Sequence, residues 1–233
     1  KALSGDSDFV DAATLDLVDQ FTVTDEKGSA ELSVEMFEAY GDHFSDTARV
    51  TVRDGADALD GFTGDVGRVI AVVDGSGPVD LTGLDLQNVD EIQIGATSGV
   101  TLDASQLTAE LTIVKDAGGT LEVVGADMDR AVELADDGRV DSYAMSGSLT
   151  DADVKDLTIA EALVYAGAVN YQVPLAGGLE FTVLDTAKAL YDAAINGDAE
   201  KGVLFDAAVV VADGGDPVTV AMSDKLGTIQ GFD

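Results

Sequence analysis

Short apolar runs recur along the middle of the chain, and each run has the length of a β-strand. Within residues 79–129 these runs are Leu84-Asp85-Leu86, Ile92-Gln93-Ile94, residues 111–114 and residues 121–124. Small or acidic residues of the kind found in turns follow most of the runs. Strand-length runs repeated at steps of about 20–30 residues predict a chain that returns again and again to the same place.

Six strand-like segments share a further feature, because each of them stops on an aspartate. These six residues are Asp25, Asp54, Asp74, Asp116, Asp185 and Asp213. An aspartate hydrogen-bonds the backbone of the residues after it, and the glycines that follow most of these positions accept positive φ. The pattern predicts strands that stack in one register and leave the stack through acidic turns.

Helical spacing interrupts the strand pattern. Ser33 is the predicted cap of a helix that ends near Phe44, and Asp185-Thr186 cap a helix over residues 187–195. Thr150, with Asp153 three residues later, predicts another helix, although residues 162–165 also suit a strand.

The predicted fold class follows from these elements: it is mainly β, a repeat-built β-solenoid similar to a β-helix, with short interspersed α-helices. Residues 1–20 form an acidic N-terminal segment. Residues 21–233 form a single elongated repeat domain, with a sub-boundary near residues 146–149 where the composition shifts toward alanine.

The strongly negative net charge of the chain argues against anionic binding partners. Aspartate and glutamate number 45 against 12 lysines and arginines, which gives a formal net charge of −33. Such a surface repels nucleic acid and anionic lipid. No run approaches the ~20 apolar residues of a membrane span. We therefore expect neither nucleic-acid binding nor membrane insertion, and the charge itself suits either salty surroundings or the binding of divalent cations.

Calcium is the cofactor that the sequence predicts. The candidate ligands are Asp54, Asp57 and Asp60 in RDGADALDG, and Asp213 and Asp216 in ADGGDP. Short carboxylates at close spacing in glycine-rich turns supply the oxygen ligands that Ca²⁺ selects. The same residues also suit turns closed by hydrogen bonds alone, and that alternative stays open. A weaker candidate group consists of Asp127, Asp129, Asp136 and Asp137.

No set of residues argues for an enzyme. The chain has no cysteine and a single histidine, His43, which no zinc-binding motif surrounds. Neither a serine-nucleophile motif nor a glycine-rich phosphate loop is present. Carboxylate pairs are too common in this chain to mark a glycosidase site, and tryptophan is absent.

Residues 89–129 and the segment LEFTVLDTAKALYDAAING (179–197) resemble degenerate repeats of large secreted bacterial surface proteins, which include adhesins, RTX-type proteins and S-layer proteins. The shared phrase is a strand, Asp-Thr-Ala, a short Ala/Leu helix and another strand. The RTX nonapeptide GGxGxDxUx is absent. The resemblance implies export, an extracellular or cell-surface location, and a structural or adhesive role that is often calcium-dependent.

The sequence thus predicts a non-catalytic structural or interaction module of a secreted or cell-surface bacterial protein, self-assembling or adhesive and calcium-responsive. Its expected partners are further copies of the chain, or a surface or glycan, since open ends of a repeat stack favour association. The alternative is a carbohydrate-binding or carbohydrate-active β-helix. A cluster of Arg, Tyr and carboxylates on one sheet face would favour that alternative.

Overall fold

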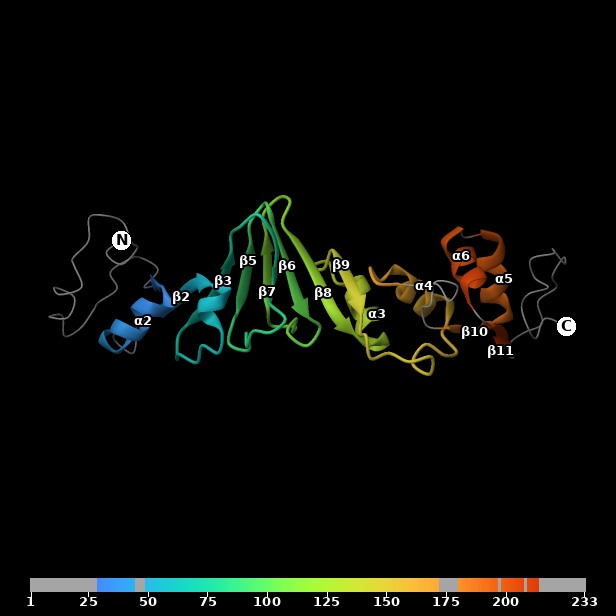
Figure 1. Cartoon of the computed structure of the whole chain (residues 1–233), viewed down its shortest axis with the longest axis horizontal. Helices are drawn as coiled ribbons and strands as arrows, with labels where there is room; N and C mark the ends of the chain where they lie inside the picture. Colours follow the sequence, from blue (N-terminus) through green and yellow to red (C-terminus); the bar gives the residue numbers. More distant parts are fainter. Residues whose placement is uncertain (1–28, 45–48, 172–179, 197, 208, 214–233) are drawn as a thin grey trace. The chain divides into compact units, whose positions relative to one another are not determined.

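The computed structural model describes residues 29–44, 49–171, 180–196, 198–207 and 209–213, and Figure 1 shows their helices and strands. The chain divides into two compact units, Lys1–Leu121 and Glu122–Asp233. The division falls within strand β8 (Thr120–Ala126). These are units of packing, so the single domain expected over residues 21–233 stays a prediction.

Parallel strands in two sheets build the first unit. A five-stranded sheet has the order β1-β2-β3-β5-β7, with the bounds β1 Ser29–Leu32, β2 Arg49–Gly55, β3 Arg68–Val73, β5 Glu91–Ile94 and β7 Thr112–Lys115. The strands β4 (Gly77–Asp80) and β6 (Ser98–Asp103) belong to a four-stranded sheet of order β4-β6-β8-β9. From β3 to β8 the chain alternates between these two sheets.

The pairing register shows a constant step over much of this unit. Ile70 of β3 pairs with Glu91 of β5, and Glu91 pairs with Thr112 of β7, so the chain advances by equal lengths between paired positions. Gly77 of β4 pairs with Ser98 of β6 at the same step. Parallel neighbours need a crossover connection, and here a strand of the other sheet lies within each crossover.

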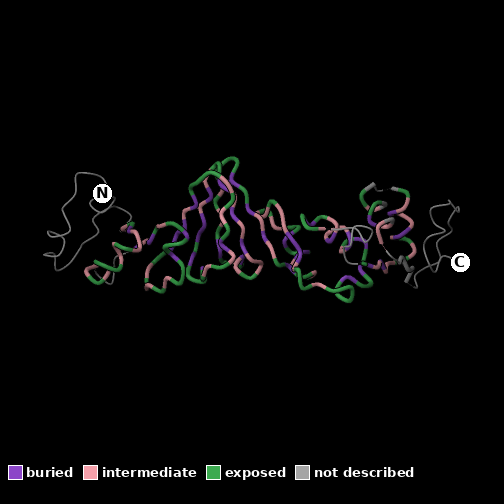
Figure 2. The backbone as a smooth tube through the Cα atoms, in the orientation of Figure 1, coloured by how far each residue is buried: buried purple, intermediate pink, exposed green. Residues whose placement is uncertain are grey.

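The core of the first unit is formed by side chains that alternate along the strands. In β6 every second residue is buried, which places Val100 and Leu102 on the inner face. Ile92 of β5 and Leu102 are both 0% exposed. The buried parts of the tube in Figure 2 follow these strands. Each fully buried aliphatic side chain of this kind stabilises the fold by about 1.5–3 kcal/mol.

A charged network covers the other face of the five-stranded sheet. Arg68 pairs with Glu91, and Gln93 Nε2 donates to Glu91 Oε1 over 2.6 Å. Arg53 Nη2 donates in turn to Gln93 Oε1 over 2.7 Å. Glu91 is only 5% exposed, so its carboxylate needs these partners to offset the loss of water.

Strands and helices alternate in the second unit. Helix α3 (Met128–Asp136) lies between β8 and β9 (Ser142–Met145), which pair in parallel. After α4 (Ile159–Gly167), β10 (Thr182–Thr186) and β11 (Val209–Asp213) form a two-stranded parallel sheet. The helices α5 (Ala187–Asn196) and α6 (Asp198–Asp206) connect these two strands and pack against α4.

Two of the predicted helix starts are confirmed. Ser33 caps α2 (Val34–Tyr40), where its Oγ accepts a hydrogen bond from Met36 N over 3.2 Å, and a 3₁₀ turn (Gly41–His43) follows the helix. Thr186 caps α5, since its Oγ1 accepts from Ala189 N over 3.2 Å. A side-chain oxygen at this position satisfies one of the backbone N–H groups that a helix start leaves unpaired.

The helix predicted to start at Thr150 is wrong. Thr150 N and Oγ1 both donate to Asp153 Oδ2 over 2.7 Å, but turns follow, and α4 begins only after Thr158. Leu157 is held extended by a parallel bridge to Val183, which prevents an earlier start. Thr158 then forms a complete capping box with a glutamate three residues later. Residues 162–165 lie within this helix, so the alternative strand there is wrong too.

The predicted fold class, a mainly β solenoid, is also wrong. Over the described residues the structure has parallel sheets of five, four and two strands with helices between them, which is a mixed, α/β-like arrangement. Helix α3 occupies residues 128–136, between β8 and β9. Ala131 and Leu134 are the buried residues of that helix, and their spacing of three is helical.

The single register predicted for the strands that end on aspartate is wrong as well. Strands β2, β3 and β7 share the five-stranded sheet, but β10 pairs with β11 in a separate sheet. Asp54 stands opposite Ala71, because the step from β2 to β3 is shorter than the step from β3 to β5. Asp25 lies outside the described residues. Asp54 is therefore offset from the later strand ends, although Val73 and Lys115, the residues before Asp74 and Asp116, both align with Ile94 of β5.

Candidate functional site

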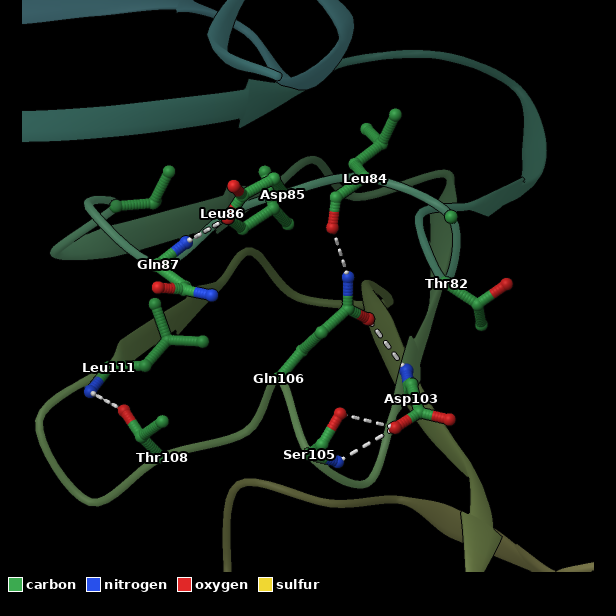
Figure 3. Close-up of a pocket in the computed structure, with 12 residues that line it drawn as sticks. Thr82, Leu84, Asp85, Leu86, Gln87, Asp103, Ser105, Gln106, Thr108 and Leu111 are labelled. Atoms are coloured by element: carbon green, nitrogen blue, oxygen red, sulfur yellow. Dashed lines mark hydrogen bonds between the residues drawn. The ribbon is translucent and has the colours of Figure 1, made fainter. Parts of the chain in front are cut away.

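A pocket of about 440 Å³ lies in the first unit, beyond the carboxyl ends of β4 and β6 (Figure 3). Two loops form it, residues 81–90 after β4 and residues 104–111 after β6. Its polar lining includes Thr82, Asp85, Gln87, Asp103, Ser105 and Gln106. Its volume is in the range of small-molecule sites, which span about 300–1,000 Å³.

The sequence pattern concealed this pocket. Leu84-Asp85-Leu86 was expected to be a strand, but the structure places these residues in the loop after β4. Leu84 N donates to Leu81 O over 3.1 Å, which closes a turn where a strand would continue. The strand of this segment is β4, which lies before the apolar run, at Gly77–Asp80.

Gln106 joins the two loops of the pocket. Its Nε2 donates to Leu81 O and to Leu84 O, both over 2.8 Å, and its Oε1 accepts from Asp103 N over 2.7 Å. The side-chain amide thus takes the place of a ladder of backbone hydrogen bonds between two loops that are distant in sequence. Gln106 is half-buried, and no feature of its local sequence marks this role.

Carboxylates shape the turns around the pocket. Asp103 Oδ1 accepts from Ser105 N over 2.9 Å and from Ser105 Oγ over 2.6 Å. Asp80 Oδ1 accepts in the same way from the backbone N–H and hydroxyl of Thr82, and these bonds, the backbone one most, lower the pKa of Asp80. Such bonds fix the loop conformation and use the hydroxyl protons that a ligand would otherwise meet.

The remaining polar side chains of the pocket include two carboxylates and the amide of Gln87. Asp85 Oδ1 accepts from Gln87 N over 3.3 Å, and Asp103 Oδ1 is used by Ser105. Within the described residues no donor reaches the second oxygen of either carboxylate. Beside them lie Leu86 and Val89, each 7% exposed, and Leu111, which is 5% exposed. The pocket therefore combines two available carboxylate oxygens with an apolar wall.

In the first unit, two of the predicted calcium ligands accept hydrogen bonds from backbone N–H groups. Asp54 Oδ2 accepts from Val34 N over 3.0 Å, and Asp60 Oδ1 accepts from Asp85 N over 2.7 Å. Asp57 is exposed on a 3₁₀ turn (Ala56–Leu59). These bonds agree with the alternative in which aspartate closes turns, yet they leave oxygen atoms for a cation.

The other predicted ligands lie at the end of the second unit. Asp213 is the last residue of β11, but only its backbone is described, and Asp216 lies outside the described residues. Across the part of the chain that the structure describes, no three metal-ligating side chains gather closely enough to hold an ion. Calcium binding therefore stays a prediction.

The weaker acidic group around α3 has structural contacts. Asp127 caps the helix, and its Oδ1 accepts from Arg130 N over 2.8 Å. Asp137 pairs with Arg139, whose Nη2 lies 2.7 Å from Asp137 Oδ2. The hydrogen bonds from Arg139 lower the pKa of Asp137, and the same pairing raises the pKa of Arg139. Asp129 and Asp136 are exposed.

Three aspartates connect segments that are distant in sequence but adjacent in the sheets. Asp54 accepts from the first N–H of α2, at Val34, and Asp185 Oδ2 accepts from the first N–H of α4, at Ile159, over 3.2 Å. Asp90 Oδ2 accepts from Val69 N over 2.7 Å. In each case the carboxylate accepts a hydrogen bond from a backbone N–H group of a segment that comes earlier in the sequence. In the two helix cases it also meets the positive end of the helix dipole.

No family model, curated protein or solved structure matches this chain. Within the described residues, no helix combines the length and the apolar character that a membrane crossing requires.

Proposed function

We propose that the chain is a non-catalytic structural or interaction module of a secreted or cell-surface bacterial protein, self-associating or adhesive. The observation that supports this most is the use of its aspartates. Asp54, Asp90 and Asp185 bind backbone N–H groups of neighbouring segments and do not converge on a reaction centre. Carboxylates that bind the backbone of other segments stabilise the fold of a structural module.

The ends of the sheets support self-association. Within the described residues, β1 lies at one end of the five-stranded sheet and β11 at one end of the two-stranded sheet. A strand at the end of a sheet presents backbone groups that a strand of another chain can pair with. The expected partners are further copies of the chain, or a surface or glycan at the cell exterior.

Self-association is tested by light scattering with size-exclusion chromatography over a wide range of protein concentration. We expect the mean mass to rise with concentration, and to rise further when calcium is added. A constant monomer mass under all conditions would contradict the self-associating form of the proposal. If the chain stays monomeric, the same sample is tested for binding to intact bacterial surfaces. That binding decides whether the adhesive form of the proposal holds.

Calcium-responsiveness belongs to the same proposal. A net charge of −33 makes the folded chain repel itself, and bound cations would relieve that repulsion. For an extracellular module a Kd of ~10⁻⁴–10⁻³ M is typical, and calcium at about 100 times Kd stabilises by about 2.7 kcal/mol. Melting curves in CaCl₂, MgCl₂ and NaCl at equal ionic strength test this. Equal effects of the three salts would refute a specific site.

Substitutions then locate the ion. Asp57→Asn with Asp60→Asn is compared with Asp213→Asn with Asp216→Asn, and the pair that abolishes the calcium effect marks the site. Asparagine at position 60 keeps an oxygen for the bond from Asp85 N, so a lost calcium response is not a lost turn. The carbohydrate-binding alternative gains less support, because no aromatic side chain lines the pocket between the two loops.

A further inference from the structure

We infer that residues 168–171, which follow helix α4, form an edge cap that closes the sheet β4-β6-β8-β9 to strand addition at β9, and that Asn170 holds this cap in place. The partner kept away from β9 is a second copy of the chain, since every copy carries the same edge and backbone pairing needs no particular side chains. The inference deepens the proposed self-association, because it restricts which strands take part in it, but the cap itself can be tested on a monomeric chain.

Three hydrogen bonds attach the edge cap to β9. Val169 N donates to Tyr143 O over 2.8 Å. Asn170 Oδ1 accepts from Met145 N over 2.8 Å, and Asn170 Nδ2 donates to Met145 O over 2.9 Å. Strand β9 pairs in parallel with β8 along its other edge. The cap therefore binds the backbone groups that β9 would otherwise offer to a further strand.

An asparagine side chain is suited to the end of a β-ladder. Its amide has a carbonyl oxygen and N–H donors, so it pairs with a strand residue in the way that a backbone peptide group does. A backbone segment would continue the ladder and present a far edge of its own, whereas a side chain ends with this one pair. Met145 is only 5% exposed, so its N–H and C=O need these bonds in place of water. Asn170 thus satisfies the edge of β9 without offering a new one.

Aromatic side chains hold the edge cap against the helices of the second unit. The ring of Tyr171 stands edge-on to the ring of Tyr165 in α4, with centroids 5.3 Å apart, and its hydroxyl donates to Asp206 Oδ2 in α6 over 3.1 Å. From β9, the Tyr143 hydroxyl donates to Val164 O of α4 over 2.6 Å. The cap is thus anchored at two helices, so its position at β9 is part of the fold of one chain and needs no second copy.

The opposite end of the same sheet is blocked in a different way. As far as the structure describes the chain, β4 and β9 are the two end strands of this sheet. Gly77 N and Leu81 N both donate to carbonyl groups of residues 97–101, which include the start of β6. Backbone groups alternate in direction along a strand, so Pro78 faces away from β6. Pro78 is exposed and has no N–H to donate, and proline on an end strand hinders pairing with another chain. Both ends of this sheet therefore oppose strand addition, which directs the proposed self-association to other strands such as β1.

Hydrogen exchange of the full chain measures the cap directly. Asn170→Leu keeps the size of the side chain but removes both bonds to Met145, so the Met145 amide is expected to exchange at least about five-fold faster, as for a lost hydrogen bond. The Ser146 amide, which donates to Ala126 O of β8 over 2.8 Å, reports whether the sheet itself stays folded. Unchanged exchange at Met145 would overturn the role of Asn170. An equal loss of protection at Ser146 would overturn the cap as well, because Asn170 would then hold the sheet together and not merely close its edge.

Light scattering over a range of protein concentration measures what the cap prevents. Asn170→Leu is expected to raise the mean mass about two-fold over wild type at equal concentration, from monomer toward dimer, without added calcium. Asn170→Asp keeps the acceptor for Met145 N and places a charge at the edge, which opposes strand pairing, so it is expected to leave the mass unchanged. The matched control is Asn88→Leu, which removes a bond to Phe62 O from an exposed asparagine in a loop. An equal rise with Asn88→Leu, or no rise with Asn170→Leu, would refute the cap.

A single introduced cysteine locates the new contact, since the chain has no cysteine of its own. In the Asn170→Leu background, Ser142→Cys in β9 is expected to be cross-linked between copies by a short bis-maleimide, whereas Asp57→Cys, at an exposed turn, is not. Equal cross-linking of both variants would place the contact elsewhere and contradict strand addition at β9. If wild type stays monomeric in every condition, the self-association proposal fails while Asn170→Leu still decides the cap. If wild type associates and Asn170→Leu changes neither exchange nor mass, the cap fails and the self-association proposal stands.

Discussion

The pocket loops should lose their connection when Gln106 is replaced by methionine, which has similar length but no amide. The substitution removes hydrogen bonds of 2.7, 2.8 and 2.8 Å: it leaves Asp103 N without an acceptor and Leu84 O without a donor, and Leu81 O keeps only the bond from Leu84 N. A neutral hydrogen bond contributes about 0.5–1.5 kcal/mol. Because Gln106 is only half-buried, water replaces part of the loss, so we expect about 2–3 kcal/mol from the three bonds together.

Native-state hydrogen exchange at the β5 and β6 amides measures this loss in the first unit alone. The matched control is Gln87→Met in the facing loop, where the side chain is exposed, and it is expected to change the opening free energy by less than about 0.5 kcal/mol. If the two variants gave the same opening free energy, the three hydrogen bonds of Gln106 would contribute nothing net. The role assigned to this residue would then be refuted.

Three further effects follow from the packing and the charges. Ile92→Ala, at a fully buried position, should lower the free energy of unfolding by about 2–5 kcal/mol. Ile113→Ala, at a half-buried position on the end strand β7, should lower it by clearly less. Urea titration compares the two variants, and equal losses would contradict the core described above. Thr158→Ala should cost about 1 kcal/mol at α4 by removing its capping box, measured by hydrogen exchange of α4 amides. Asp137 has a lowered folded pKa, so its stabilising effect is present above the pKa of the unfolded carboxyl group and disappears as the pH falls through the folded value; the melting difference between wild type and Asp137→Asn should shrink in acid, and a constant difference would rule out the link.

Local chemistry allowed several elements to be predicted from the sequence. Strands over residues 49–55, 91–94 and 112–115 follow from apolar and β-branched runs that end in turns. The starts of α2 and α5 follow from Ser33 and Thr186, because a cap is formed between residues two or three apart. For these features the partners lie within one turn of chain, so the order of residues contains enough information.

The candidate site could not be found in the same way. Leu84 and Leu86 have the alternation of a strand, but they line a loop because β4 ends at Asp80 and Gln106, in the loop after β6, holds the turn. The sequence shows a glutamine there but not the carbonyls that it reaches. The two carboxylates of the pocket also belong to separate loops, and only the pairing of β4 with β6 brings those loops together.

The sequence by itself determined the acidic surface, the strand-length runs, two helix caps and the aspartates at strand ends, since each depends on composition or on neighbours along the chain. The tertiary structure alone decided how those parts pair. It set a shorter step between β2 and β3 than between the later strands, and it directed Asp54 to Val34 and Asp185 to Ile159. The physical reason is that a carboxylate binds whichever unpaired N–H the register brings within reach, and the register depends on packing between segments that are far apart along the chain.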